Sequence, residues 1–129
     1  CLSYLTIENR GPIPEEFRPA LGDQVFACDI CQDVCPWNRK PRQVHERGPL
    51  PKHATLSLVD SLMIDAQTFR QRYRHTPIWR ATPEGLARNA AVVLGNLGDP
   101  AAIPHLVRAA EHHPSERVRE HAAWALDQL

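Results

Sequence analysis

The chain has 129 residues, a formal net charge of zero and 43% apolar side chains, enough to bury the core of one modest domain. No stretch approaches the roughly 18 uninterrupted apolar residues that a membrane span needs. The charge is unevenly distributed: residues 37–90 hold ten Lys and Arg against four acidic side chains, whereas residues 1–36 hold two against six. A basic middle of this kind fits a solvated, arginine-rich surface as well as a site for a polyanion.

The N-terminal part is expected to consist of short elements and turns. Residues 2–7 form an apolar segment. Pro14 and the two acidic residues after it predict a helix start, because negative charge is favourable at a helix N-terminus, and Gly22 predicts the helix end. The chain starts with Cys1 instead of Met, so we expect a fragment whose preceding part lies outside this sequence.

The second half is expected to be helical, after an irregular, proline-rich and basic connector over residues 41–54. From about Thr55, apolar residues recur at spacings of three and four, as one buried helix face requires. Asp65 is suited to cap the second of these helices, and Thr82 precedes a proline that can occupy the first turn of the third. The later helix boundaries are expected at Gly98-Asp99-Pro100 and at Pro114-Ser115.

The last three helices have features of HEAT-type repeats, namely the Gly-Asp-Pro junction, alanine-rich inner faces and an Arg-Val-Arg segment around Val118. Each repeat must bury its face on a neighbour, so we expect a preceding part or the cysteine segment to close one end. The residues expected to face inward are Leu86, Ala90, Val93, Leu94, Leu97, Ile103, Leu106, Val107, Ala110, Val118, Ala122, Ala125, Leu126 and Leu129.

All four cysteines, Cys1, Cys28, Cys31 and Cys35, lie within the first 35 residues. A disulfide framework would need an oxidising compartment, and no feature of the sequence indicates secretion. A structural zinc site would use two separated pairs of Cys or His, and Cys28-x-x-Cys31 is one good pair. However, the spacing C-x-x-C-x-x-x-C-P is not a typical zinc pattern, so both alternatives are weaker than an iron–sulfur site.

An iron–sulfur cluster fits the spacing best. Bacterial ferredoxins carry the run C-x-x-C-x-x-C-x-x-x-C-P, in which the cysteine before proline ligates the other of two clusters. This chain has the last three cysteines of such a run, and the first is displaced to Cys1. We therefore expect Cys1, Cys28 and Cys31 to hold one [4Fe-4S] cluster and Cys35 to reach a second, with four further cysteines supplied from outside the chain.

The expected fold class is mainly α, in three parts. Residues 1–40 would form a partial ferredoxin-like [4Fe-4S] cysteine-loop segment, and residues 41–54 the connector. Residues 55–129 would form HEAT-like antiparallel helix pairs.

Three stretches of the sequence resemble epoxyqueuosine reductase. The first is Cys-Leu-Ser-Tyr-Leu-Thr-Ile-Glu over residues 1–8, and the second is Val-Phe-Ala-Cys-Asp-Ile-Cys-Gln-Asp-Val-Cys-Pro-Trp-Asn over residues 25–38. Arg88-Asn89-Ala90, followed by Leu-Gly-Asn at 94–96, is also similar to the C-terminal region of that family. The Cys-Pro-Trp-Asn ending is more specific than a generic ferredoxin motif, and the resemblance covers essentially the whole chain.

The resemblance implies a cytoplasmic, monomeric enzyme without membrane association, which uses cobalamin and two [4Fe-4S] clusters and receives electrons from an external donor. It implies reduction of the epoxide of epoxyqueuosine to queuosine in the anticodon loop of tRNA. The catalytic acid and most of the cobalamin pocket would lie outside this chain, so no catalytic residue is assigned in it and the fragment alone should be inactive. By position, Ser3 and Asp29 are expected to lie against the cofactor. Ala27 replaces a glycine common in the family, with little effect expected.

The basic middle of the chain gains a role from this resemblance, because tRNA is a polyanion whose affinity is built from many phosphate contacts. A solvated surface position remains the more frequent outcome for any single arginine. As a group, the side chains expected to contact tRNA phosphates are Arg39, Lys40, Arg42, Arg70, Arg72, Arg74, Arg80 and Arg88.

Other candidate residues favour structural roles. Trp37 is expected to shield a cluster or to pack, and Trp79 and Tyr73 to pack at helix ends more than to stack on a base. His112 and His113 lack ligand spacing and are expected at the surface. No Ser-His-Asp set, phosphate-binding glycine loop or pair of catalytic carboxylates can be identified.

Two alternatives to a reductase remain open. One is a helical-repeat binding module without catalysis of its own, stabilised by zinc or by a cluster. The other is a ferredoxin-type electron carrier fused to a helical scaffold. Metal content separates zinc from iron–sulfur, and cobalamin binding by the longer protein separates the reductase from the carrier.

Overall fold

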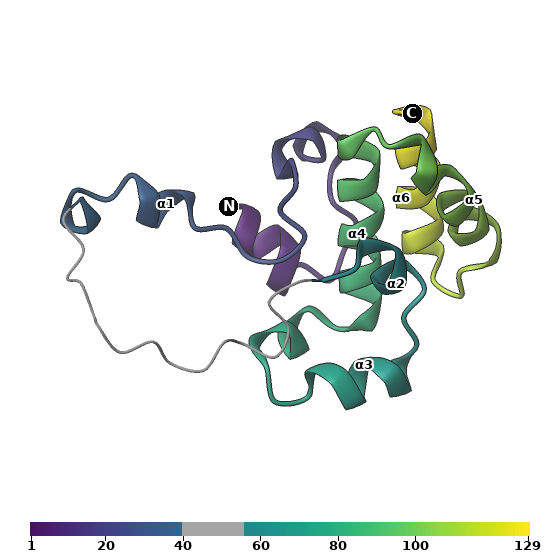
Figure 1. The fold of residues 1–129 in the computed structure, drawn as a ribbon, viewed down its shortest axis with the longest axis horizontal. Coiled ribbons are helices and arrows are strands. Elements are labelled where there is room, and N and C mark those ends of the chain that lie inside the picture. The colour runs from purple at the N-terminus through teal and green to yellow at the C-terminus, as the bar shows by residue number, and fades with distance from the viewer. Residues whose placement is uncertain (40–55) are drawn as a thin grey trace.

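A computed structural model describes residues 1–39 and 56–129 (Figure 1). All regular structure within these residues is helical, without a strand, as the sequence predicted, and none of the helices there is long and apolar enough to cross a membrane. The expected connector at 41–54 lies outside the described residues. The α-helices are α1 (Ile30–Asp33), α2 (Leu58–Leu62), α3 (Ala66–Tyr73), α4 (Pro83–Leu97), α5 (Ile103–His112) and α6 (Glu116–Asp127), and the shorter 3₁₀ or π turns are η1 (Tyr4–Glu8), η2 (Glu15–Phe17), η3 (Pro19–Leu21), η4 (Pro36–Asn38), η5 (Pro77–Ala81) and η6 (Pro100–Ala102).

Helix α4 lies at the centre of the helical body. Helices α2 and α6 pack against it, and α5 packs against α6 (Figure 1). Small side chains along α4 allow its neighbours to approach closely, which gives the dense packing of a protein interior. The largest apolar cluster joins Leu62 with Ala87, Ala91 and Leu94 of α4, Ala102, Leu106 and Ala109 of η6 and α5, and Val118, Ala122 and Ala125 of α6.

The N-terminal segment covers another face of α4. Ile13 and Leu21, which are 0% and 1% exposed, pack with Val92 of that helix. In Figure 1 the segment lies along one side of α4, with α6 on the other side. The part of the chain that carries Cys1 therefore rests directly on the HEAT-like helices.

A third apolar cluster fixes α3 and η5 beside the start of α4. Ile64, Phe69, Tyr73 and Leu86 are its buried members. The ring of Trp79 stacks on Phe69 with centroids 5.6 Å apart, and the ring of Tyr73 meets Phe69 edge-on at 5.3 Å. Tyr73 thus packs within the protein, as expected, whereas Trp79 stacks on Phe69 with one side of its ring system and remains 42% exposed.

The helix predicted between Pro14 and Gly22 is instead two 3₁₀ turns, and the last helix starts after Ser115 without a side-chain cap. Side-chain caps stabilise three of the other predicted starts. One carboxylate oxygen of Asp65 accepts hydrogen bonds from the N–H groups of Gln67 and Thr68, both at 2.8 Å. The Thr82 hydroxyl accepts from the Gly85 N–H at 3.2 Å, and Asp99 caps η6 in the same way. These contacts satisfy N–H groups that a helix start leaves without partners.

Some residues expected to face inward do not. Leu97 is 54% exposed, Leu129 39%, and Ile103 and Val107 are both 38% exposed. Helix α5 lies at the edge of the body and packs mainly on α6, so only the narrow stripe of Leu106 and Ala109 is buried. The spacing of apolar residues shows which side of a helix faces the core, but the width of the buried stripe depends on how many neighbouring helices cover it.

Gly95 lies where α4 and α6 approach most closely, and its replacement by alanine is expected to destabilise the protein. A Cβ at this position would lie 2.8 Å from both Cα and Cβ of Ala125. Backbone cannot move aside cheaply, so the overpacking should outweigh the better helix propensity of alanine, with a net loss of about 1–3 kcal/mol in urea unfolding. Gly85→Ala is the matched control on the same helix, because its Cβ would meet only the Thr82 hydroxyl at 3.3 Å. Equal stability of the two variants would contradict the close approach.

Candidate metal centre and basic surface

The four cysteines lie in two places. Cys1 lies three residues before η1, whereas Cys28, Cys31 and Cys35 lie on the segment around α1, which projects from the helical body (Figure 1). All four are free thiols, with Cys1 and Cys31 exposed and Cys28 and Cys35 partly exposed. Each thiol is therefore chemically available as a ligand.

Local hydrogen bonds shape the loop that carries three of the cysteines. The carbonyl of Asp29 accepts from the N–H groups of Gln32 (2.8 Å) and Asp33 (2.9 Å), which forms the single turn of α1. The N–H of Cys35 donates to the Gln32 carbonyl at 3.2 Å, and the side-chain amide of Asn38 donates to the same carbonyl at 3.0 Å. The conformation of the loop is thus encoded in its own short sequence.

The same loop exposes large apolar side chains. Ile30 is 58% exposed, Val34 69% and Trp37 92%. The expected packing of Trp37 does not occur within the described residues. Neighbouring exposed apolar side chains of this kind are typical of surfaces that contact another group or protein segment.

Two hydrogen bonds hold the segment of Cys1 beside that of Cys28. The Ser3 hydroxyl donates to the Cys28 carbonyl at 3.2 Å, and the buried Thr6 hydroxyl accepts from the Ala27 N–H at 3.1 Å. Residues more than twenty positions apart in the sequence are thereby brought together. Ser3, which we expected at a cofactor, here links the two cysteine segments.

Ala27 adopts a left-handed backbone conformation, with φ of 63°. An L-residue with a Cβ is strained there by about 1–2 kcal/mol, whereas glycine is not. The conformation therefore favours glycine at this position, and the little effect expected of alanine stays a prediction. The strained residue directly precedes Cys28, and its N–H is held by Thr6.

The kind of donor present fits an iron–sulfur cluster, since thiolates are the ligands of such clusters and four free thiols are available. Within residues 1–39 and 56–129, however, no three Cys, His, Asp or Glu side chains converge on a point where a metal could sit. Cys1, Cys28 and Cys31, expected to share a cluster, are thus not gathered into a closed site by this chain.

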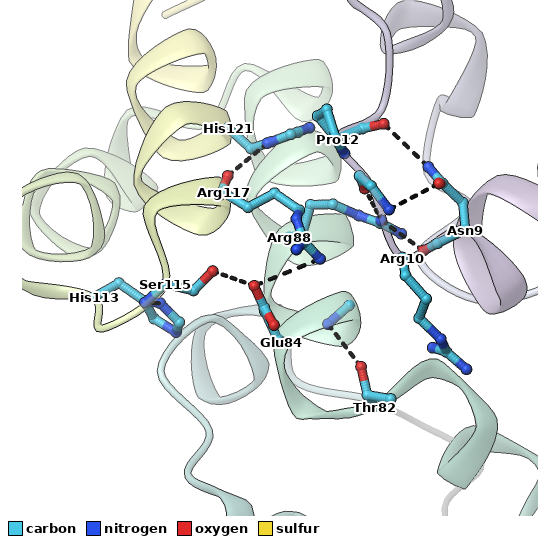
Figure 2. Close-up of polar contacts among 12 residues, drawn as sticks. Asn9, Arg10, Pro12, Thr82, Glu84, Arg88, His113, Ser115, Arg117 and His121 are labelled. Carbon is cyan, nitrogen blue, oxygen red and sulfur yellow. Dashed lines mark hydrogen bonds and ion pairs between the residues drawn. The ribbon is translucent and has the colours of Figure 1, made fainter.

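Arg88 was expected to contact tRNA phosphates, but the structure buries it, so that expectation is wrong. Its side chain is 0% exposed and points into the N-terminal segment (Figure 2). The guanidinium donates to the carbonyls of Asn9 (2.9 Å), Gly11 (2.6 Å) and Leu5 (2.7 Å), and twice to the Asn89 side-chain oxygen (2.8 and 3.1 Å). Burial lowers the pKa of Arg88 to about 10, so it remains charged at neutral pH. All its donors are used inside the protein, and none is available to a phosphate.

The other described arginines expected at tRNA are exposed. Arg70, Arg72 and Arg74 lie on or directly after α3, and no ion pair involves them among the residues that the structure describes. Arg80 is 65% exposed, but its guanidinium pairs with Glu8. The free positive charge of this region is therefore concentrated on α3.

The remaining basic residues of the expected surface lie elsewhere. Arg39 is exposed and directly follows η4. In Figure 1 the projecting segment around α1 lies well apart from α3. Lys40 and Arg42 lie outside the described residues. Of the basic residues expected at tRNA, the structure thus places three exposed ones on or directly after α3, where Arg70 and Arg74 share a face and Arg72 points to another.

An open hollow of about 810 Å³ lies beside the N-terminal ends of α3, α4 and α6. Its charged lining includes Asp65, Glu84, Glu116 and Glu120 against Arg117. Glu84 accepts a hydrogen bond from the Ser115 hydroxyl and lies 3.5 Å from Arg117 (Figure 2). The excess of carboxylates makes this hollow unsuitable for a polyanion, in contrast to α3.

Two buried histidines were not foreseen. His113, expected at the surface, is 6% exposed, and its Nδ1 accepts from the Ser115 N–H at 3.1 Å. Burial lowers its pKa. His121 is 0% exposed, with Nε2 accepting from the Ile13 N–H (3.0 Å) and Nδ1 donating to the Arg117 carbonyl (2.7 Å). The only sequence signal for His121 was its position three residues after Val118 on the inner face of α6.

Comparison with known families defines the class of the chain. Residues 1–38 match the family model of a 4Fe-4S double cluster binding domain, and residues 78–129 match that of HEAT repeats. The chain is thus similar to a cluster-binding domain in its first part and to HEAT repeats in its last part, and the expected fold class is confirmed.

Individual relatives are more specific. The chain is 45% identical, over 98% of its length, to the epoxyqueuosine reductase of Pseudomonas aeruginosa and 34% identical, over its whole length, to that of Bacillus subtilis. It also superposes with a TM-score of 0.87, at 31% identity and over 99% of its length, on a crystal structure of epoxyqueuosine reductase with a tRNA-Tyr epoxyqueuosine-modified stem loop. The resemblance to the epoxyqueuosine reductases is therefore confirmed, although the chain spans only about a third of their length, 36%, 34% and 34% of these three.

Proposed function

We propose that this chain is the cluster-ligating and tRNA-docking part of an epoxyqueuosine reductase, an oxidoreductase of queuosine biosynthesis. The observation that carries the proposal is the 45% identity to a reductase over 98% of the chain, in which both the cysteine segment and the helical repeats take part. A fold match alone would not suffice, because one fold serves many functions.

The four cysteines supply half of the ligands that two [4Fe-4S] clusters require. Cys1, Cys28 and Cys31 serve one cluster and Cys35 the other, by the ferredoxin pattern in which the cysteine before proline ligates the second cluster. The remaining ligands come from residues outside this chain. The exposed Ile30, Val34 and Trp37 then become covered by the clusters and by the protein that completes them.

Cobalamin is the proposed second cofactor, at the edge of the cluster segment. When bound, clusters and cobalamin supply the two electrons that, with two protons, convert the epoxide to an alkene and release its oxygen as water. Ser3 and Asp29 are the residues of this chain that we propose contact it. The Ser3 hydroxyl donates its hydrogen to Cys28, but its oxygen can still accept a hydrogen bond, and Asp29 is exposed. The catalytic acid lies outside this chain, which should be inactive alone.

The proposed tRNA surface centres on α3. Arg70, Arg72 and Arg74 present free guanidinium groups to solvent, and Arg39 adds a separate positive charge on the projecting segment. Such groups position a nucleic acid through its phosphates without reading its sequence. We further propose that the protein acts as a cytoplasmic monomer and receives electrons from an external donor.

The tRNA surface predicts a salt-dependent loss of binding when its charge is removed. Replacing Arg70, Arg72 and Arg74 together by glutamine in the full-length protein should weaken tRNA binding by about 10- to 100-fold, and should reduce the slope of log affinity against log salt by about 2–3. Arg80→Gln is the matched comparison and should have a smaller effect, because Arg80 already pairs with Glu8. An unchanged affinity and salt slope in the triple variant would refute this docking surface.

A further inference from the structure

The side chain of Asn89 is fully buried on α4 and uses its whole hydrogen-bonding capacity. Its amide nitrogen donates to the carbonyl of Thr6 at 2.7 Å and to that of Val25 at 3.0 Å. Its oxygen accepts from Arg88 Nε and Nη2. Four bonds saturate a side-chain amide, so this one has a single possible orientation.

The neighbouring guanidinium enforces that orientation. Arg88 can only donate, so the oxygen of Asn89 must face it, and the two N–H bonds must then point at the N-terminal segment. Since Arg88 also holds the carbonyls of Leu5, Asn9 and Gly11, the pair forms a rigid platform beneath that segment.

The two carbonyls held by Asn89 belong to the two arms that carry cysteines. Thr6 lies on the turn that begins after Cys1, and Val25 lies three residues before Cys28. The hydroxyl of Thr6 also holds the N–H of Ala27, in its strained conformation. A single amide of the HEAT-like region thus binds both arms, in addition to the Ser3 and Thr6 hydroxyls that link the arms directly.

We propose that Asn89 is a positioning residue for the iron–sulfur site: it holds the Cys1 and Cys28 arms at the separation at which both thiolates can ligate one cluster. The proposal rests on the proposed function. If Asn89 has this role, the helical repeats influence the reduction potential of the cluster, because ligand geometry and nearby hydrogen bonds tune that potential.

The test compares two substitutions on α4 in the full-length, anaerobically purified protein. Asn89→Asp keeps the size of the side chain and an acceptor for Arg88, but it replaces both donors with a carboxylate oxygen facing the carbonyls of Thr6 and Val25. Asn96→Asp is the matched control. Asn96 donates in the same way to the carbonyls of Arg18 (2.9 Å) and Gly22 (3.1 Å), which precede Cys28 by ten and six residues and are not held by Asn89.

The readouts are iron content and the electron paramagnetic resonance spectrum and midpoint potential of each reduced cluster. Asn89→Asp should change the signal and the midpoint potential of one cluster, or should abolish that cluster. In the second case the iron content should fall from about eight to about four per chain. Asn96→Asp should lower thermal stability without changing either cluster. If Asn89→Asp also lowers stability only, the positioning role is refuted.

A second variant keeps the test decisive if Asn89→Asp does not fold. Asn89→Ser adds no charge, but a hydroxyl has a single hydrogen and cannot hold the carbonyls of Thr6 and Val25 together, so it should change the same cluster. An unchanged spectrum in Asn89→Ser would overturn the proposal. Absence of iron from the unmodified protein would instead refute the proposed function, so the two failures are distinguishable.

Discussion

Replacing Arg88 by methionine is expected to lower the free energy of unfolding by about 3–5 kcal/mol, because the change leaves several buried acceptors without hydrogen-bond donors. The carbonyls of Leu5, Asn9 and Gly11 and the oxygen of Asn89 would all lose donors in the interior. Urea unfolding followed by circular dichroism measures the loss.

Two controls separate this network from a general effect of removing arginine. Arg88→Lys should recover less than half of the loss, since lysine has three donors at one point and cannot reproduce the planar fork. Arg119→Met should cost less than about 1 kcal/mol, because Arg119 is only partly buried and bonds to the carbonyls of His113 and Pro114 near the surface. Similar losses for Arg88→Met and Arg119→Met would contradict the network.

Acidification is expected to destabilise the protein between about pH 6.5 and pH 4, largely through His121. Burial lowers the pKa of His121 to about 4, from an ordinary value near 6.5. The unfolded chain therefore binds more protons in this window, so the stabilisation is complete above pH 6.5 and is lost as the pH falls towards 4. The shift corresponds to about 3 kcal/mol, measurable by urea unfolding at a series of pH values.

The variant His121→Gln isolates the contribution of this residue. Glutamine does not titrate, and its side-chain oxygen can accept from the Ile13 N–H as Nε2 does. The slope of stability against pH should therefore become flatter in the variant. A residual slope is expected from His113, whose pKa burial also lowers. An equally steep pH dependence in the variant would show that His121 is not the titrating group.

The helix boundaries could be predicted from the sequence because their causes are local. Asp65, Thr82 and Asp99 each cap the helix or turn that follows them, and such a cap needs only the next three residues. The cysteine spacing predicted the cluster-binding segment for the same reason, since ligand spacing is a property of one short loop.

The role of Arg88 could not be predicted, because it depends on contacts with residues about eighty positions away. An arginine in a basic stretch ordinarily lies at the surface, and nothing near it in the sequence reveals the carbonyls of Leu5, Asn9 and Gly11. His121 escaped prediction in the same way, since its partner Ile13 is remote. Buried polar side chains that join distant segments have no periodic signature, although Arg88 and Asn89 do lie in a stretch that resembles the reductases.

Metal analysis of the anaerobically purified full-length protein tests the central claim most directly. The measurement is iron, acid-labile sulfide and zinc per chain. Cluster ligation by Cys1, Cys28, Cys31 and Cys35 predicts about eight irons and eight sulfides, the content of two [4Fe-4S] clusters, and a loss of about four irons in Cys35→Ser. One tightly bound zinc without iron would contradict the account, and would leave a zinc-stabilised helical-repeat binding module in place of the reductase.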